Sequence, residues 1–224
     1  MKQTFFVAGT DTGVGKTVLT ALLAQFLRKR GVSAAALKPV CSGGRDDARA
    51  LLAALGGALS LDEINPWHFR APLAPLLAAR RERKQVEFAD VLAHVRSMQK
   101  LFDTLLIEGA GGLLSPLGRN FDSRDLIIAL RAVPIIVCPD QLGAVNRVLL
   151  TLEALPKTFR DRARVVLILP PKPDAAAAAN ATLLAEFFDA KRIFVLPWLG
   201  EKIQARRVLR NPALRQVLQA LVRS

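Results

Sequence analysis

The chain has 224 residues, 51% of them hydrophobic, and its 32 Lys and Arg against 19 Asp and Glu give a formal charge of +13. This length suits one α/β domain, and the apolar fraction excludes a disordered chain because enough apolar surface can be buried to offset the entropy of ordering. Cys41 and Cys138 lack CxxC spacing, no apolar run reaches the roughly 18 residues of a membrane span, and no signal-peptide pattern opens the chain. We therefore expect a cytoplasmic protein, whose charge leaves nucleic acid, an anionic membrane and small acidic substrates open as partners.

The first forty residues predict a strand, a glycine-rich turn, a helix and a second strand. Apolar residues over 4–8 indicate the first strand, and apolar residues at helical spacing over 18–27 indicate the helix, which ends at Gly31. The second strand, over 34–37, is stopped by the Lys38-Pro39 pair. Such a βαβ unit implies a parallel sheet.

The same alternation continues to the end of the chain. The further expected elements are helices over 46–55, 87–101, 123–130, 144–155 and 175–188, strands over 104–107, 133–138, 165–169 and 193–196, irregular structure over 59–75, and a helical stretch over 203–222 broken at Pro212. No internal repeat or flexible linker interrupts this order. The pattern predicts a single domain over residues 1–224, with a doubly wound, mainly parallel sheet and helices on both faces.

Residues 9–17, GTDTGVGKT, lie between the first strand and the first helix and are typical of a phosphate-binding loop. Glycines let backbone N–H groups approach phosphates, and the helix N-terminus adds partial positive charge. Lys16 is expected to reach the β- and γ-phosphates, and the Thr17 hydroxyl to bind Mg²⁺. Five residues separate Gly9 from Gly15, where the usual pattern has four. The loop and its flanking elements predict a fold like that of the P-loop NTPases.

Two acidic residues and one lysine follow predicted strands. Glu108 comes directly after the strand over 104–107, while Asp47 lies shortly after the strand that ends at Lys38. Open α/β sheets bind ligands beyond the carboxyl ends of their strands. We therefore expect both carboxylates to complete a Mg²⁺ shell and Lys38 to face the phosphates.

Four segments, in this order, resemble the dethiobiotin synthetases: GTDTGVGKT, LKPVCSG, DDARAL and IEGAGG. Weaker support comes from Pro72 and Pro75, Ser115-Pro116-Leu117, the segment Leu142–Asn146 and the segment Leu196–Leu199. The resemblance spans nearly the whole chain. It implies one parallel-sheet P-loop domain that works as a homodimer, with no nucleic acid or membrane partner.

The resemblance also implies an ATP- and Mg²⁺-dependent ring closure. One amine of 7,8-diaminopelargonate takes up CO₂ as a carbamate, and a carbamate oxygen attacks the γ-phosphate of ATP. The second amine then displaces phosphate from the mixed anhydride and closes the ureido ring of dethiobiotin, an intermediate of biotin synthesis.

Site residues are implied by the same resemblance. Catalysis would rest on Lys16, Lys38 and Thr12; substrate binding on Thr12, Ser42, Gly143 and Asn146, the last two from the partner subunit; and metal binding on Thr17, Asp47 and Glu108. The nucleotide would contact Gly13, Val14, Gly15, Lys16, Thr17, Val18, Asp47, Glu108, Gly109, Ala110, Gly111, Pro197, Trp198 and Leu199.

Two positions depart from the family pattern. The family usually has an Asn after the strand over 165–169, where it contacts the adenine edge, but this chain continues Leu169-Pro170-Pro171. We expect other nucleoside triphosphates to be accepted within about an order of magnitude of ATP, because no side-chain amide selects the base. Leu76 stands where the family often has His.

Other classes of protein match the sequence less well than this family. A switch ATPase of the ParA/MinD kind, which binds DNA or partner proteins, fits the basic charge, but its loop carries an early lysine where this chain has Thr10 and Asp11. The related amide-forming enzymes of cobalamin synthesis usually carry a further glutaminase domain, for which 224 residues leave no room. His68 and His94 lack metal-ligand spacing, and the arginines near the C-terminal end are typical of a solvated surface.

Overall fold

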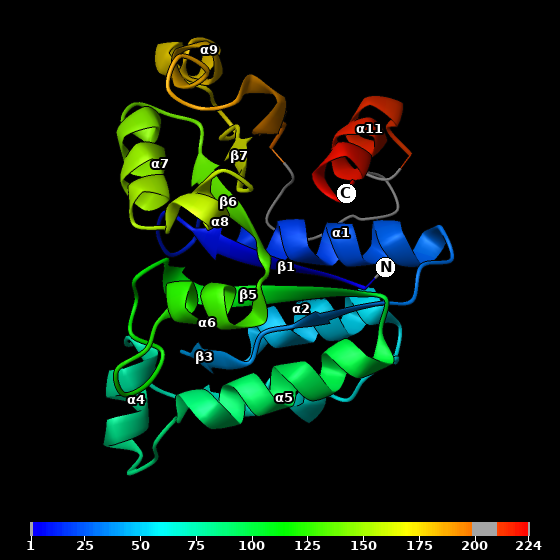
Figure 1. Cartoon of the computed structure of the whole chain (residues 1–224), viewed down its shortest axis with the longest axis vertical. Coiled ribbons are helices and arrows are strands. Elements are labelled where there is room, and N and C mark those ends of the chain that lie inside the picture. Colours follow the sequence, from blue (N-terminus) through cyan, green and yellow to red (C-terminus); the bar gives the residue numbers. More distant parts are fainter. Residues whose placement is uncertain (1, 199–209, 224) are drawn as a thin grey trace.

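A parallel sheet of six strands forms the centre of the computed structural model, which describes residues 2–198 and 210–223 (Figure 1). Its strand order is β2-β5-β1-β6-β7-β8, and every pairing between neighbours is parallel. The strands are β1 Gln3–Gly9, β2 Ala34–Leu37, β5 Thr104–Gly112, β6 Val133–Pro139, β7 Arg164–Ile168 and β8 Ile193–Leu196. The predicted fold class is thereby confirmed.

Helices cover both faces of this sheet (Figure 1). The helix α1 packs against α2 and α11 on one face, while α5 contacts α6, and α7 contacts α8 and α9, on the other. Their bounds are α1 Lys16–Lys29, α2 Asp46–Leu55, α3 Leu61–Ile64, α4 Pro75–Arg81, α5 Phe88–Leu101, α6 Ser123–Leu130, α7 Ala144–Glu153, α8 Lys157–Arg160, α9 Asn180–Leu184 and α11 Pro212–Leu221. Within the described ranges, no helix has the length and apolar character needed to cross a membrane.

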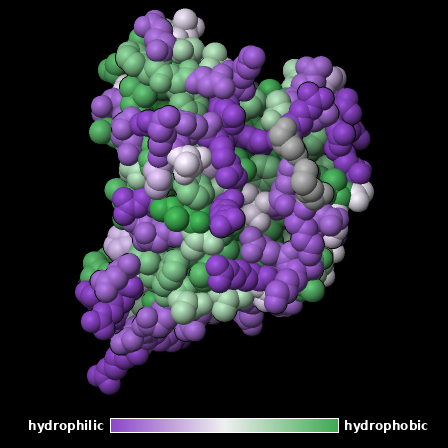
Figure 2. All heavy atoms as spheres, in the orientation of Figure 1, coloured by the Kyte–Doolittle hydropathy of each residue, from purple (hydrophilic) through white to green (hydrophobic). Residues whose placement is uncertain are grey.

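The strands are largely apolar because both sides of the sheet are covered. All four residues of β2 and all five of β7 are buried, and so are the last five of β1. Strands buried on both faces have continuous apolar sequences rather than alternating ones. Hydrophilic residues cover much of the face shown in Figure 2, with hydrophobic patches between them.

The expected irregular stretch over 59–75 proved wrong in part. It contains α3, which starts with a reciprocal capping box between Ser60 and Glu63, and the strand β4 Trp67–Phe69. This strand pairs in parallel with β3 Val40–Ser42 to form a second sheet of two strands. Strands of three residues are too short to give a periodic signal in the sequence, which is why the prediction missed them. The helix α4 was also not expected, although Pro75 stands in its first turn, where proline is favoured.

Two other predicted elements differ from the structure by more than two residues or in type. The strand expected over 104–107 continues to Gly112, because β1 pairs with it from Gln3–Thr104 to Val7–Glu108 and, after an irregularity in the register, again at Gly9–Gly112. The helix expected over 175–188 is a 3-10 helix at Ala175–Ala178 followed by the short α9. The alanines are mostly exposed and offer no large apolar face to pack on the sheet. Of the stretch expected over 203–222, residues 203–209 lie outside the described ranges.

Candidate active site

The glycine-rich loop joins β1 to α1 in a conformation that requires glycine. Gly13 and Gly15 have φ of +73° and +97°, in the left-handed region that other residues rarely adopt. A Cβ on Gly15 would lie 2.8 Å from Cδ1 of Ile168. Gly15 is also the N-cap of α1, and no side chain caps that end of the helix. The first N–H groups of α1 therefore remain available to an anion.

Lys16 links this loop to the end of β5. Its side chain is buried, and Nζ donates to the backbone oxygens of Asp11 at 2.7 Å and Gly111 at 2.8 Å. Burial, followed by the positive charge of Lys38, lowers the pKa of Lys16 to about 8. A phosphate would offset the cost of keeping this ammonium out of water.

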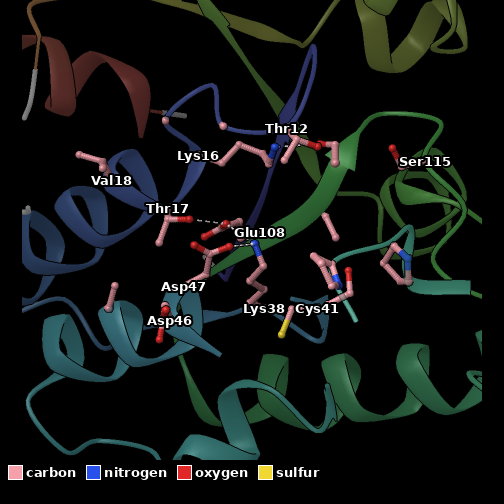
Figure 3. Close-up of a pocket in the computed structure, with 18 of the residues that line it drawn as sticks. Thr12, Lys16, Thr17, Val18, Lys38, Cys41, Asp46, Asp47, Glu108 and Ser115 are labelled. Carbon is pink, nitrogen blue, oxygen red and sulfur yellow. Dashed lines mark hydrogen bonds and ion pairs between the residues drawn. The ribbon is translucent and has the colours of Figure 1, made fainter. Parts of the chain in front are cut away.

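Four side chains from four elements meet beside the loop (Figure 3). Nζ of Lys38, just after β2, lies 2.5 Å from Oδ2 of Asp47 on α2 and 2.6 Å from Oε1 of Glu108 on β5. The Thr17 hydroxyl, on α1, donates to the same Glu108 oxygen at 2.7 Å. Lys38 and Glu108 are buried, whereas half of the Asp47 side chain is exposed. The sheet order explains this meeting, since β2, β5 and β1 are adjacent.

The ion pairs hold Lys38 and Asp47 in their charged forms. Burial is the largest influence on the pKa of Lys38 and lowers it, but Glu108 and Asp47 together outweigh burial and raise that pKa above its usual range. Burial raises the pKa of Asp47, and the charge and hydrogen bond of Lys38 reverse this and lower it. Lys38 and Asp47 therefore both stay charged at neutral pH.

The donors of this cluster suit a Mg²⁺ ion shared with a nucleotide. Among the described residues, Glu108 Oε2 is buried and has no hydrogen-bond partner. No group of three His, Cys, Asp or Glu side chains within the described ranges could hold a metal alone. Mg²⁺ in phosphate-binding sites usually takes one or two carboxylates and completes its shell with phosphate oxygens and water. Two carboxylates and the Thr17 hydroxyl match that requirement.

A cleft of about 1010 Å³ runs past these side chains. It is lined by Thr12, Gly13, Gly15, Lys16, Thr17, Val18, Lys38, Ser42, Asp47, Glu108, Ala110 and Gly111 among the expected site residues. Gly111 has φ of +68°, and a Cβ there would lie 2.4 Å from Oγ of Ser115, which also lines the cleft. One connected space thus contains most of the residues predicted to bind phosphate, metal and diamine.

Some lining residues were not expected from the sequence. Gln25 on α1 and Ala50 and Ala54 on α2 extend the cleft between these two helices. The last two follow Asp47 at spacings of three and seven, which places all three on one face of α2. That helical spacing was the signal that could have identified them.

Other predicted site residues lie apart from this cleft. Val14 is buried beneath the loop, and Gly109 lies inside β5, where a Cβ would meet Ser123 and Phe6. The remaining ones are Gly143 and Asn146 at the start of α7, and Pro197 and Trp198 after β8. Leu199 lies outside the described residues.

Comparison with known proteins gives relatives along most of the chain. The family model of an AAA domain matches residues 3–206. The ATP-dependent dethiobiotin synthetase BioD of Anaeromyxobacter dehalogenans (strain 2CP-C) is 38% identical over 209 residues, which cover 91% of this chain and 94% of that protein. The proteins of the same name from Thermodesulfovibrio yellowstonii and Akkermansia muciniphila are 35% and 34% identical, covering 90% and 91% of this chain and 91% and 93% of their own lengths.

A solved structure resembles the fold. The structure of pNOB8 ParA bound to nonspecific DNA covers 99% of this chain and 98% of its own, with a TM-score of 0.57 and 14% sequence identity. At this identity the likeness supports the P-loop fold and nothing about the ligand.

Proposed function

The chain belongs to the ATP-dependent dethiobiotin synthetase family, and we propose that it converts 7,8-diaminopelargonate, CO₂ and ATP into dethiobiotin, ADP and phosphate. The family resemblance predicted from four sequence segments is confirmed, and with it an ATP-dependent ligase of biotin synthesis. The observation that carries the proposal is the single cleft in which Lys16, Lys38, Asp47 and Glu108 lie together with the phosphate-binding loop.

In this proposal the loop holds the triphosphate. The N–H groups at the start of α1 and the Lys16 ammonium would bind phosphate oxygens, while Thr17, Asp47 and Glu108 would hold Mg²⁺. The metal would neutralise charge on the β- and γ-phosphates. Glu108 lies inside β5 rather than on a flexible loop, so its carboxylate is already in position before the nucleotide binds.

The diamine would occupy the part of the cleft lined by Thr12 and Ser42. One amine attacks CO₂ and loses a proton to give a carbamate, whose oxygen bonds to the γ-phosphorus as the bond to ADP breaks. The second amine then bonds to the carbamoyl carbon, and phosphate leaves. Lys38 is buried and lines the cleft, and its ammonium would stabilise the negative charge on the carbamate and on the transferred phosphoryl group.

A second subunit would complete the substrate site. Gly143 caps α7 with φ of +83°, no side chain caps this helix, and the neighbouring Leu142 is 80% exposed. The N–H groups in the first turn of α7 suit a carboxylate, but this end of the helix does not line the cleft of the same chain. We propose that the partner subunit supplies them, with Asn146, in a homodimer. Mixing inactive Lys38→Ala and Asn146→Ala chains should restore about a quarter of the activity by random pairing if each site combines both chains.

The nucleotide base would lie near the ends of β7 and β8, close to Pro197 and Trp198. Leu169 already donates its N–H to the Leu196 oxygen at 2.9 Å, and Pro170 and Pro171 have no N–H. Comparable kcat/KM for ATP, GTP and CTP, within about tenfold, is therefore expected. An ATP preference of about 100-fold or more would refute this part of the proposal.

The decisive experiment measures phosphate release and dethiobiotin formation together. The wild-type protein should release phosphate only when diaminopelargonate and bicarbonate are both present, with one dethiobiotin per phosphate. Lys38→Ala should still bind nucleotide but lose most turnover, whereas the exposed Lys157→Ala should behave as wild type. Stimulation by DNA without any response to the diamine would instead indicate a switch ATPase.

A further inference from the structure

Asn65 is a buried hydrogen-bonding residue behind the cleft, which it does not line. It follows α3 and has no exposed surface. Its Nδ2 donates to the backbone oxygen of Lys38 at 2.7 Å, and more weakly to those of Pro39 at 3.4 Å and Trp67 at 3.3 Å. The amide thus holds the backbone at the point where the chain leaves β2.

The oxygen of the same amide faces donors. Oδ1 of Asn65 accepts from Nε of Arg45 at 3.2 Å and from Sγ of Cys41 at 3.1 Å. With three carbonyls on one side and two donors on the other, only one orientation of the amide satisfies every group. The Arg45 guanidinium is fixed in turn, since it donates to the oxygens of Leu61 and Asn65 and pairs with Asp62 at 2.8 Å.

Arg45 connects this network to the acidic end of α2. It is the N-cap residue of that helix, and its backbone oxygen accepts from the N–H of Arg49 at 2.9 Å. Asp47 is the second residue of the helix and pairs with Lys38. The contacts therefore form a closed ring: Lys38 backbone, Asn65 amide, Arg45 guanidinium, the start of α2, Asp47 carboxylate and Lys38 ammonium.

The two carboxylates are held by different parts of the fold. Glu108 lies on β5, whose neighbour β2 carries Lys38 just beyond its last residue, and the Leu37–Ile107 pair sets their register. Asp47 is not in the sheet. Outside the cleft, two hydrogen bonds join the start of α2, which carries Asp47, to the Lys38 backbone: one from Arg45 to Asn65 and one from Asn65 to the Lys38 oxygen.

We propose that Asn65 and Arg45 are positioning residues that set the separation between the Lys38 ammonium and the Asp47 carboxylate. The proposal rests on the proposed function for its kinetic consequence, because it assigns Lys38 and Asp47 to the reacting phosphate and carbamate. A displacement of about 1 Å in such groups lowers turnover by about 100-fold. Breaking the ring should therefore affect the chemical step more than nucleotide binding, which depends mainly on the loop.

Two substitutions interrupt the ring at different places. Asn65→Asp keeps an oxygen for Arg45 but loses the donor to the Lys38 carbonyl, and Arg45→Lys keeps the charge but cannot donate to both Asn65 and Leu61 in the same geometry. Each should lower kcat by about 30- to 100-fold, leave KM for ATP within about threefold, and raise the Mg²⁺ concentration at half-maximal rate by about tenfold.

A matched control separates positioning from general destabilisation. Val95→Ala removes buried side-chain volume from α5, on the opposite face of the sheet from α2. Assays are run at temperatures where each variant is more than nine-tenths folded, as judged by thermal unfolding. A kcat loss in Asn65→Asp no larger than that of Val95→Ala would overturn the proposal.

Crystal structures of the variants give a readout that does not depend on the reaction. The proposal expects the distance between Lys38 Nζ and Asp47 Oδ2, 2.5 Å here, to increase by about 1 Å or more while the Lys38–Glu108 pair stays intact. An unchanged Lys38–Asp47 distance in both variants would refute it. If the wild-type protein forms no dethiobiotin, the proposed function fails, and this distance together with Mg²⁺-dependent ATP binding by calorimetry still decides the positioning role.

Discussion

Replacing Glu108 by Gln tests how much the buried Lys38–Glu108 ion pair contributes to the stability of the protein and how much to its turnover. The carboxylate lies 2.6 Å from Lys38 Nζ, and both side chains are almost fully buried. The substitution keeps the shape of the side chain and an oxygen for the Thr17 hydroxyl, but it removes one of the two negative charges beside Lys38. We expect loss of both stability and turnover.

The size of the stability loss follows from what remains around Lys38. Removing one partner of a buried pair costs about 3–5 kcal/mol when the other charge is left alone. Lys38 keeps Asp47 at 2.5 Å, although that carboxylate is half exposed and screened by water. We therefore expect about 2–3 kcal/mol, or a Tm lowered by roughly 4–12 °C for a chain of this length.

The double variant Lys38→Met/Glu108→Gln provides the critical comparison. With both members of the Lys38–Glu108 pair replaced, neither charge is left buried without its partner, so the stability of the double variant should return to within about 1 kcal/mol of the wild type. Its dethiobiotin synthesis should stay at least about 100-fold reduced, because the groups proposed to act on the phosphate and metal are missing.

The assay is thermal and denaturant unfolding of the wild type, both single variants and the double variant, with dethiobiotin formation measured on the same preparations. A Glu108→Gln protein as stable as the wild type would refute the reasoning. So would a double variant less stable than Glu108→Gln, since the cost of an uncompensated Lys38 charge would then be absent.

Three smaller predictions concern the end of β5, Lys16 and the C-terminal helix α11. Gly111→Ala should lower kcat/KM by about 10-fold or more, because its Cβ would lie 2.4 Å from Ser115 Oγ, whereas Gly57→Ala, with positive φ but open space, should cost only about 1–2 kcal/mol of stability. Since the pKa of Lys16 is about 8, nucleotide binding at pH 8.5 should take up protons in calorimetry with different buffers, and Lys16→Arg should abolish this uptake. Arg164→Gln should speed proteolysis of α11 by about 10-fold or more without changing kcat, because its buried guanidinium donates to two backbone oxygens at that end of the chain.

Most of the main sheet could be predicted because its strands are short apolar runs separated by helical periodicity and by glycine or proline. The same signals do not exist for β3 and β4, which have three residues each and depend on pairing with one another. The end of β5 was set by its partner β1 rather than by its own sequence, since glycines predict a turn unless a neighbouring strand is known.

The candidate site could be predicted at positions where the residue type and its place after a loop or strand together indicate one kind of chemistry. A lysine after a glycine loop and a carboxylate after a buried strand indicate phosphate and metal binding without further information. Asn65 carried no such signal, because a buried amide that binds backbone groups can be recognised only once those groups have been placed around it. Its importance depends on contacts between residues 38, 45 and 65, which no local pattern encodes.

The net charge of +13 does not explain how the cleft holds a nucleotide once it is bound. Lys16 and Lys38 are matched there by Asp47 and Glu108, so the four buried or half-buried charges sum to zero. The bound phosphates would then be held by the oriented N–H groups at the start of α1, by Mg²⁺, and by the Lys16 ammonium, which is buried and poorly solvated. These contributions act at short range, whereas exposed arginines act through a field that 0.15 M salt screens within about 8 Å. Raising salt should therefore slow nucleotide association while leaving the dissociation rate nearly unchanged, and a strong increase in dissociation would place the binding charge on the surface instead.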